Sequence, residues 1–259
     1  MSAPWVASVM AAVLSPESSG AGASLAEEAL REMREQGASI LQLVGSLGPV
    51  ITSEEDSQRA RAMSFLAHAM TCMEWLVRTE TDVNYLSQYF ASHFEDWPTT
   101  GQALRGWSEL FERCQPSDAS QPPPLWTLSD VLVLSAADAF SHNVFLRSMS
   151  ALDRLQGLRF LRGVLERRGE LLTRKMPGLA ETVVAAVDGE KDPRCLLQAF
   201  ACVRALLEAH DLCADDAQAQ ARLEAGGADL FDVLACYFPV LFTPRAGDDG
   251  SITREDLAQ

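Results

Sequence analysis

The sequence predicts an all-α fold, either a globular bundle or an α-solenoid of stacked helix pairs. Apolar residues recur at the 3.6-residue helical period along most of the 259-residue chain. Sustained period-two alternation and Asn-Gly hairpin signals are lacking, which disfavours a β fold. The amphipathic segments, of roughly 12 to 20 residues, are joined by short turns, which suits a globular bundle or stacked helix pairs. The chain shows no exact sequence repeat, but degenerate helical repeats share only a core pattern.

Residues 1–23 are small and rich in Ser and Gly, with Glu17 as their one charge. This composition predicts a mobile tail before a repeat array over residues 24–259. Ser24 and Glu27 have the spacing of a capping box, and Gly37 is placed to end that helix in a left-handed conformation.

Ile40, Leu43, Val44 and Leu47 then share one helical face. Further amphipathic segments follow at 52–77, 82–94, 100–114, 127–140, 155–169, 171–187, 193–210 and 219–238. Pro177 is expected to start or kink its helix. Three successive prolines predict an extended surface loop at residues 115–126.

The net charge and the cysteines of the chain indicate which partner molecules and which cellular location to expect. The chain holds 36 acidic and 21 basic residues, a formal charge of −15, which disfavours direct binding to nucleic acid or to an anionic membrane. Six dispersed cysteines in a long helical chain indicate a reducing compartment, and no run reaches the 18 apolar residues of a membrane span. We therefore expect protein partners and a cytoplasmic or nuclear location.

The motifs of common catalytic and metal sites are missing from the sequence. The four histidines are isolated, and no HExxH, CxxC, GxSxG or phosphate-binding loop occurs. Cys195 and Cys202 stand two helical turns apart, about 10 Å, too far to share one ion without other ligands, so we interpret them as small core residues. No cofactor, metal or catalytic residue is predicted, and an enzyme using a nucleophile such as Cys202 is the third-ranked alternative.

Basic residues gather in the otherwise acidic chain between Asp153 and Lys175. The candidate partner-binding patch comprises Arg154, Arg159, Arg162, Arg167 and Arg168. It could dock an acidic segment of a partner. The competing interpretation is a solvated helix face whose cations suit the negative end of the helix dipole.

The stretch "VDGEKDPRCLLQAF", Val187 to Phe200, concentrates charges and could suggest a metal or phosphate site. Its order favours a corner between two helices instead: Asp188 follows an apolar run, Gly189 can take a left-handed turn, Asp192 can cap, and Pro193–Arg194 opens the next helix.

Together with "CYFP" at 236–239, "FTP" at 242–244 and "REDL" at 254–257, this stretch resembles the N-terminal region of a known family. It is the family of the large HEAT-repeat adaptor of the cytosolic iron-sulfur targeting complex, named for sensitivity to methyl methanesulfonate. "ILQLVGSLGPVI" and "QRARAMSFLA" are similar to its first helical pair.

The resemblance implies an α-solenoid of HEAT- or armadillo-like helix pairs. It also implies a non-catalytic scaffold that recruits apoproteins to cytosolic iron-sulfur cluster assembly, supporting DNA repair, replication and transcription enzymes. Its implied partners are those apo iron-sulfur client enzymes, a WD40 propeller protein and a small cluster-assembly protein, the last two contacted through C-terminal repeats. A full-length member is several times longer, so we expect a fragment, a truncated gene model or a short isoform. The alternative is a generic helical-repeat scaffold in transport or transcription.

Overall fold

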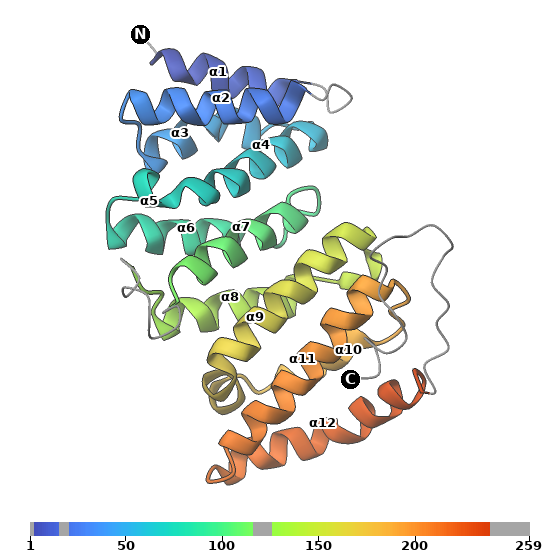
Figure 1. Ribbon diagram of the computed structural model, residues 1–259. Helices are drawn as coiled ribbons and strands as arrows, with labels where there is room; N and C mark the ends of the chain where they lie inside the picture. Colours follow the sequence, from blue (N-terminus) through green and yellow to red (C-terminus); the bar gives the residue numbers. More distant parts are fainter. Residues whose placement is uncertain (1–2, 16–20, 116–125, 239–259) are drawn as a thin grey trace. The chain divides into compact units, whose positions relative to one another are not determined.

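The computed structural model of the protein describes residues 3–15, 21–115 and 126–238. All regular structure in these residues is helical, as the sequence predicts. The contacts divide the chain into two compact units, Met1–Leu132 and Val133–Gln259, each of which is a stack of helices (Figure 1).

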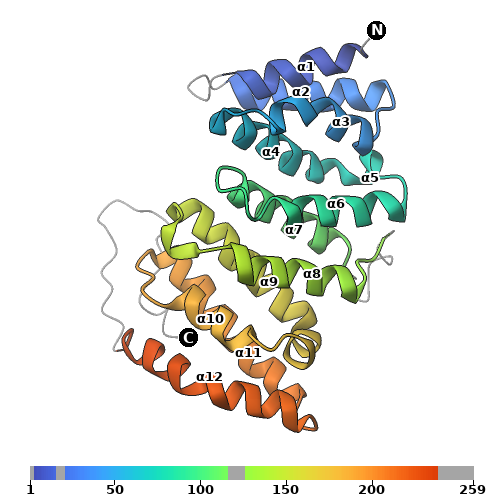
Figure 2. The ribbon, with the colours of Figure 1, turned by 180° about the vertical axis from the view of Figure 1, so that it is seen from behind.

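The first unit contains seven of the α-helices and one 3-10 turn. They are α1 (Pro4–Leu14), α2 (Ala21–Glu35), α3 (Ile40–Ile51), α4 (Asp56–Ala69), η1 (Met70–Cys72), α5 (Met73–Leu76), α6 (Glu80–Ser92) and α7 (Thr100–Arg113). Packing joins α1 to α2, α3 to α4 and α6 to α7, and α4 also packs on α7. Figure 2 shows these pairs following one another down the unit.

The prediction of a mobile tail over residues 1–23 was wrong for α1. Trp5, Val9 and Val13 recur every four residues, are buried, and pack the helix against α2. The Ser8 hydroxyl also donates a 2.6 Å hydrogen bond to Glu32. Three apolar residues at helical spacing thus anchor a helix in a stretch whose composition predicted a tail, and α2 begins at Ala21 rather than at the predicted cap, Ser24.

The helix end predicted at Gly37 is correct. Gly37 has φ of +63°, the left-handed conformation predicted for it. Ser39 caps α3 through a capping box with Gln42. The amphipathic segment predicted at 52–77 becomes helical at Asp56, where Glu55 is the N-cap residue. The proline-rich loop predicted at 115–126 falls mostly outside the described residues.

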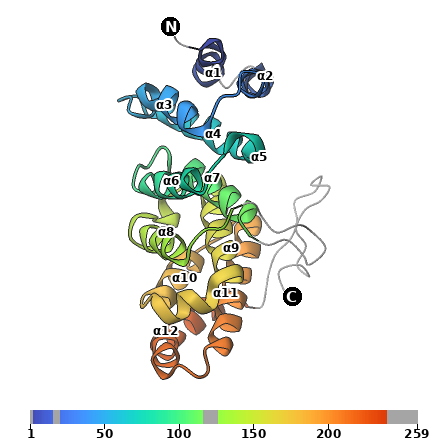
Figure 3. The same cartoon turned by 90° about the vertical axis from the view of Figure 1, so that its left-hand side faces the viewer.

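The second unit contains the remaining helices, except that the first turn of α8 lies at the unit boundary. They are α8 (Asp130–Asn143), η2 (Leu146–Ser148), α9 (Ala151–Lys175), α10 (Leu179–Val187), α11 (Pro193–Leu212) and α12 (Ala217–Ala235). Figure 3 shows α9 and α11 together on one side of this unit, with α8 and α10 on the other. The core lies between these two layers.

The break that the sequence pattern placed after Gly169 coincides with a kink in α9. The kink is at Arg168, whose φ and ψ are −136° and 21°, and the helix continues beyond it to Lys175. The helix ends at Met176 because a residue before proline is pushed into extended backbone, here φ −110° and ψ 101°. Pro177 therefore separates α9 from α10.

Helices α9 and α11 run in the same direction in successive repeats. Three cysteine thiols donate to backbone carbonyl groups of α9: Cys195 to Ala151 at 3.5 Å, Cys202 to Leu158 at 3.5 Å, and Cys213 to Glu170 at 3.7 Å. The residue offsets of these contacts are 44, 44 and 43, so the register shifts by only one residue along both helices, across the kink at Arg168.

The same period separates equivalent helices in the first unit. Helix α4 begins at Asp56 and α7 at Thr100, 44 residues later. Periods of roughly 40 to 47 residues are typical of HEAT and armadillo repeats. The structure thus contains the helical repeat that the sequence shows only as a pattern of apolar residues.

Close approach of α9 and α11 gives a stability prediction. A Cβ added at Gly169 would lie 2.6 Å from the Cβ of Ala209, so Gly169→Ala should lower the free energy of unfolding by about 1 to 3 kcal/mol through overpacking. Gly227 in α12 has no atom within 4 Å of such a Cβ, and Gly227→Ala should stabilise by roughly 0.5 to 1 kcal/mol. Chemical denaturation of both variants tests the contrast; equal effects would contradict it.

Candidate functional site

The corner between α10 and α11 is built by the residues that the sequence singled out. Gly189 has φ of +74°, which favours glycine. The Asp192 carboxylate accepts a 2.9 Å hydrogen bond from the Arg194 backbone N–H and caps α11, whose first residue is Pro193. The stretch thus forms the corner between α10 and α11.

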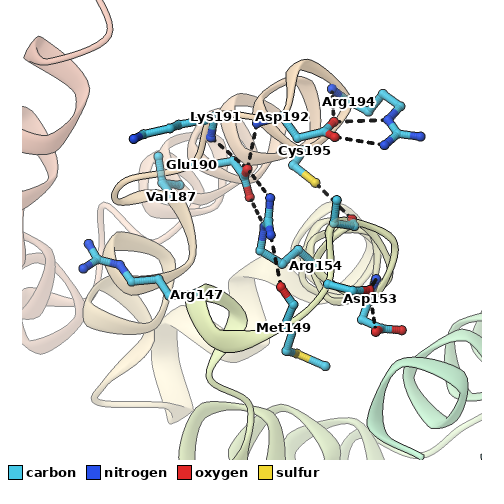
Figure 4. A network of polar contacts seen from close by, with 12 residues as sticks. Arg147, Met149, Asp153, Arg154, Val187, Glu190, Lys191, Asp192, Arg194 and Cys195 are labelled. Atoms are coloured by element: carbon cyan, nitrogen blue, oxygen red, sulfur yellow. Dashed lines mark hydrogen bonds and ion pairs between the residues drawn. The ribbon is translucent and has the colours of Figure 1, made fainter. Parts of the chain in front are cut away.

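Glu190 is the buried centre of this corner, and the sequence pattern did not single it out. Its side chain is 4% exposed. It accepts hydrogen bonds from the backbone N–H groups of Lys191 and Asp192 at 2.8 and 2.9 Å. Both bonds hold the turn in shape, so the carboxylate acts as a local template for the backbone (Figure 4).

The guanidinium of Arg154, on α9, forms a bidentate ion pair with the same carboxylate. Its Nε and Nη2 atoms donate to Glu190 at 2.7 and 2.9 Å, while Nη1 donates to the Met149 carbonyl at 3.0 Å (Figure 4). Burial alone would raise the pKa of Glu190, but the hydrogen bonds from Arg154, Asp192 and Lys191 outweigh it and lower the pKa below its ordinary value. The Glu190 carboxylate is therefore ionised and fully engaged.

The first unit repeats this arrangement with different residues. Arg59 on α4 donates through Nε and Nη2 to Asp96 at 3.2 Å each, and through Nη1 to the Ser53 carbonyl at 2.9 Å. Each arginine is the fourth residue of its helix and reaches a carboxylate just before the equivalent helix of the next repeat. We call this arrangement the arginine clamp.

Two further contacts hold the corner from outside. Arg147, in η2, pairs with the Asp188 carboxylate and donates through Nε to the Asp188 carbonyl at 3.0 Å. The Tyr237 hydroxyl donates a 2.6 Å hydrogen bond to the carbonyl of Val187. Tyr237 belongs to the "CYFP" stretch, so two sequence motifs some 50 residues apart meet at one corner.

The match to known proteins covers the same region. The family model described as the Dos2-interacting transcription regulator of RNA-Pol-II, MMS19 N-terminal, matches residues 44–259.

The chain belongs to the MMS19 family.

Its relatives in that family include plant, animal and yeast proteins. The chain is 28% identical over 221 residues to the MMS19 nucleotide excision repair protein homolog of Arabidopsis thaliana, covering 85% of this chain and 18% of that protein. It is 28% identical over 236 residues to the Homo sapiens homolog, covering 90% and 20% respectively. The DNA repair/transcription protein MMS19 of Saccharomyces cerevisiae is 26% identical over 228 residues, covering 84% and 20%. The chain spans about a fifth of the length of these MMS19 relatives.

The structure distributes the predicted basic patch among several internal contacts. Arg154 belongs to the clamp, and Arg162 pairs with Glu166 at 2.6 Å and donates to Gln198 at 3.1 Å. Arg168 donates to the carbonyl of Arg167, and Arg159 is exposed. The first two cations are thus already partnered inside this MMS19-family unit, which favours the structural interpretation; docking of a partner on the patch stays a prediction.

Arg174, further along α9, links the ends of neighbouring helices in a similar way. It meets Glu170 at 3.1 Å, Asp215 at 2.7 Å and Asp216 at 3.5 Å. Asp216 also caps α12 by accepting from the backbone N–H groups of Gln218 and Ala219. The adjacent carboxylates Asp215 and Asp216 therefore belong to a capped and ion-paired turn.

The thiols in the second unit are core residues. Cys195 and Cys202 have no exposed surface, and burial raises the pKa of both, that of Cys195 to about 12. Since the thiolate is the reactive form of cysteine, the raised thiol pKa opposes a nucleophilic role for Cys202.

In the described residues no group of three or more His, Cys, Asp or Glu side chains is placed to hold a metal ion. No helix of that part of the chain is long and apolar enough to cross a membrane.

The clamp of the second unit predicts a specific loss of stability. Arg154→Met leaves the Glu190 carboxylate buried without its counter-ion and should lower the free energy of unfolding by about 3 kcal/mol. The double variant Arg154→Met, Glu190→Gln removes that charge while keeping an acceptor for the backbone, so it should recover part of the loss. Chemical denaturation measures both.

A matched control for the clamp is available on the surface of α11. Arg204 pairs with Glu208 at 3.9 Å, and both side chains are more than half exposed. Arg204→Met should cost less than about 1 kcal/mol. If Arg204→Met lowered the free energy of unfolding as much as Arg154→Met, the clamp would stabilise the unit no more than an exposed ion pair does.

Thiol burial predicts the order of alkylation. In the native chain iodoacetamide should modify exposed Cys236 first and partly exposed Cys72 next, and spare Cys114, Cys195 and Cys202 until the chain is unfolded. Burial raises the pKa of Cys114 to about 12 as well. Peptide mass mapping reads out the order, and prompt native labelling of Cys202 would revive the nucleophile hypothesis.

Proposed function

We propose that this chain is a protein-binding scaffold of the MMS19 family that serves DNA repair and transcription proteins. The observation that carries the proposal is the family match across residues 44–259, because its description names a transcription regulator. The names of the relatives support it by referring to nucleotide excision repair and to DNA repair and transcription.

The architecture supports a scaffold in physical terms. Within each unit an arginine clamp fixes one helix pair against the next, and in the second unit the nearly constant register of α9 on α11 adds to it, which gives helix ridges with defined spacing. Stacked helical repeats use such ridges as extended binding surfaces. The strongly negative charge of the chain favours protein partners over phosphate backbones.

The finer proposal is that the scaffold recruits apoproteins to cytosolic iron-sulfur cluster assembly. It is supported by the resemblance of the "DGEKDPR" corner and the "CYFP" stretch, which contact each other through Tyr237. The proposed partners are apo iron-sulfur client enzymes, with a WD40 propeller protein and a small cluster-assembly protein contacted through C-terminal repeats of longer members. The proposed location is the cytoplasm and nucleus, and the proposed role is non-catalytic.

Affinity purification followed by mass spectrometry tests this proposal. The tagged chain, expressed in the cell that makes it, should enrich iron-sulfur enzymes of DNA repair and transcription relative to an unrelated acidic helical protein of similar size. Metal analysis of the purified chain should find no stoichiometric iron or zinc. Recovery of no iron-sulfur client or assembly protein would count against the finer proposal while leaving the family assignment intact.

A further inference from the structure

A groove of about 500 Å³ lies in the second unit between the end of α8, η2, α10 and α12. Its size falls within the range of roughly 300 to 1,000 Å³ that is usual for ligand pockets. The apolar part of its lining includes Phe140, Val144, Phe145, Leu146, Val184 and Ala185.

One of these residues exposes a large apolar surface to solvent. Phe145, in the bend between α8 and η2, is 69% exposed, whereas Phe140 and Leu146 beside it are buried. A rigid aromatic ring next to a preformed apolar groove is a typical anchor for a partner because it buries much area at low entropic cost.

The charged residues of the groove give it a negative sign. Glu181 on α10 and Asp229 on α12 are both exposed, and no ion pair joins either to another described residue. The positive side chain in the lining, Arg147, is already engaged by Asp188. The uncommitted charges that a ligand would meet are therefore carboxylates on two facing helices.

We propose that this groove binds a basic amphipathic segment of a partner protein. Its apolar side chains would cover Phe145 and enter between α8 and α10, while Lys or Arg side chains at its edges would pair with Glu181 and Asp229. Amphipathic segments that dock an apolar face in a groove are a common mode of recognition. The proposal deepens the scaffold function proposed above and rests on it, since it names where a client or assembly factor is held.

Net charge disfavours two other possible occupants of the groove, the chain's own residues 239–259 and a second copy of the chain. The chain's own residues 239–259 contain Asp248, Asp249, Glu255 and Asp256 against Arg245 and Arg254, so this segment is acidic. A second copy of the chain would bring a formal charge of −15 toward the same carboxylates. Like charges across an interface oppose association, so a basic partner is the occupant that matches the groove.

A peptide titration with the full chain tests the proposal. The probe is a fluorescein-labelled amphipathic peptide of about 16 residues, with Leu and Phe at i, i+3, i+4 and i+7 and with Lys and Arg at its edges. We expect saturable binding that weakens with added salt, because salt screens exposed charge pairs. Two matched peptides, one with Glu for every Lys and Arg and one with Ser for every Leu and Phe, should bind at least about tenfold more weakly.

Variants of the chain locate the binding site. Ala185→Arg fills the groove from an exposed helical position and should weaken binding at least about tenfold, as should the pair Glu181→Lys, Asp229→Lys. Glu224→Lys makes the same charge change on α12 at an exposed residue that does not line the groove, and it should leave binding within about twofold. Circular dichroism verifies folding, and if Ala185→Arg misfolds, the double charge variant decides.

The remaining outcomes overturn the proposal. These are failure of the basic peptide to bind, equal binding of the acidic peptide, or binding unaffected by the groove variants. A peptide of residues 239–259 that binds more tightly would assign the groove to the chain's own segment. A dimer in sedimentation that Ala185→Arg dissociates would assign it to a second copy. Client proteins that still co-purify with the Ala185→Arg variant would refute client binding in the groove and would leave the proposed scaffold function intact.

Discussion

The pairing of Arg154 with Glu190 is the interaction on which the second unit most depends. A buried carboxylate is costly unless charge and hydrogen bonds compensate it, and Glu190 obtains both, from one guanidinium and two backbone N–H groups. Because the same arginine also donates to the Met149 carbonyl, three segments are fixed at once: the start of α9, the turn before it and the corner before α11. The start of α9, the turn before it and the corner before α11 are therefore held in place by the same side chain.

The second constraint is the size of side chains between α9 and α11. Cysteine, alanine and glycine occupy the line of closest approach, at Cys195, Cys202, Ala209 and Gly169. A small apolar thiol satisfies such a position and also donates weakly to a carbonyl group. Cysteine is used there for its volume and its polarity, and this explains why a cysteine-rich helix need not indicate metal or redox chemistry.

Features with a local cause could be predicted from the sequence, and features that depend on distant partners could not. The turn at Gly189, the cap at Asp192 and the first helical residue Pro193 follow from rules that operate within a few residues. The burial of Glu190 depends on Arg154, 36 residues earlier, which no local pattern reports.

The error near the N-terminus has the same origin. Helix α1 looks like a tail in composition because the helical spacing of Trp5, Val9 and Val13 matters only where the helix packs against α2. The groove was likewise invisible in sequence, since α8, η2, α10 and α12 each contribute only part of its wall.

The nearly equal spacing of the two arginine clamps, 36 residues from Arg154 to Glu190 and 37 from Arg59 to Asp96, also has an evolutionary consequence. Adding or deleting several residues inside either interval would move the following helix and pull the carboxylate away from its guanidinium. Length changes can accumulate only where no clamp spans the chain. The proline-rich stretch at 115–126 lies in such an interval, between the end of one clamp at Asp96 and the start of the next at Arg154. Insertions and deletions among homologues should therefore concentrate there, and the clamped intervals should keep their length even where their sequences diverge.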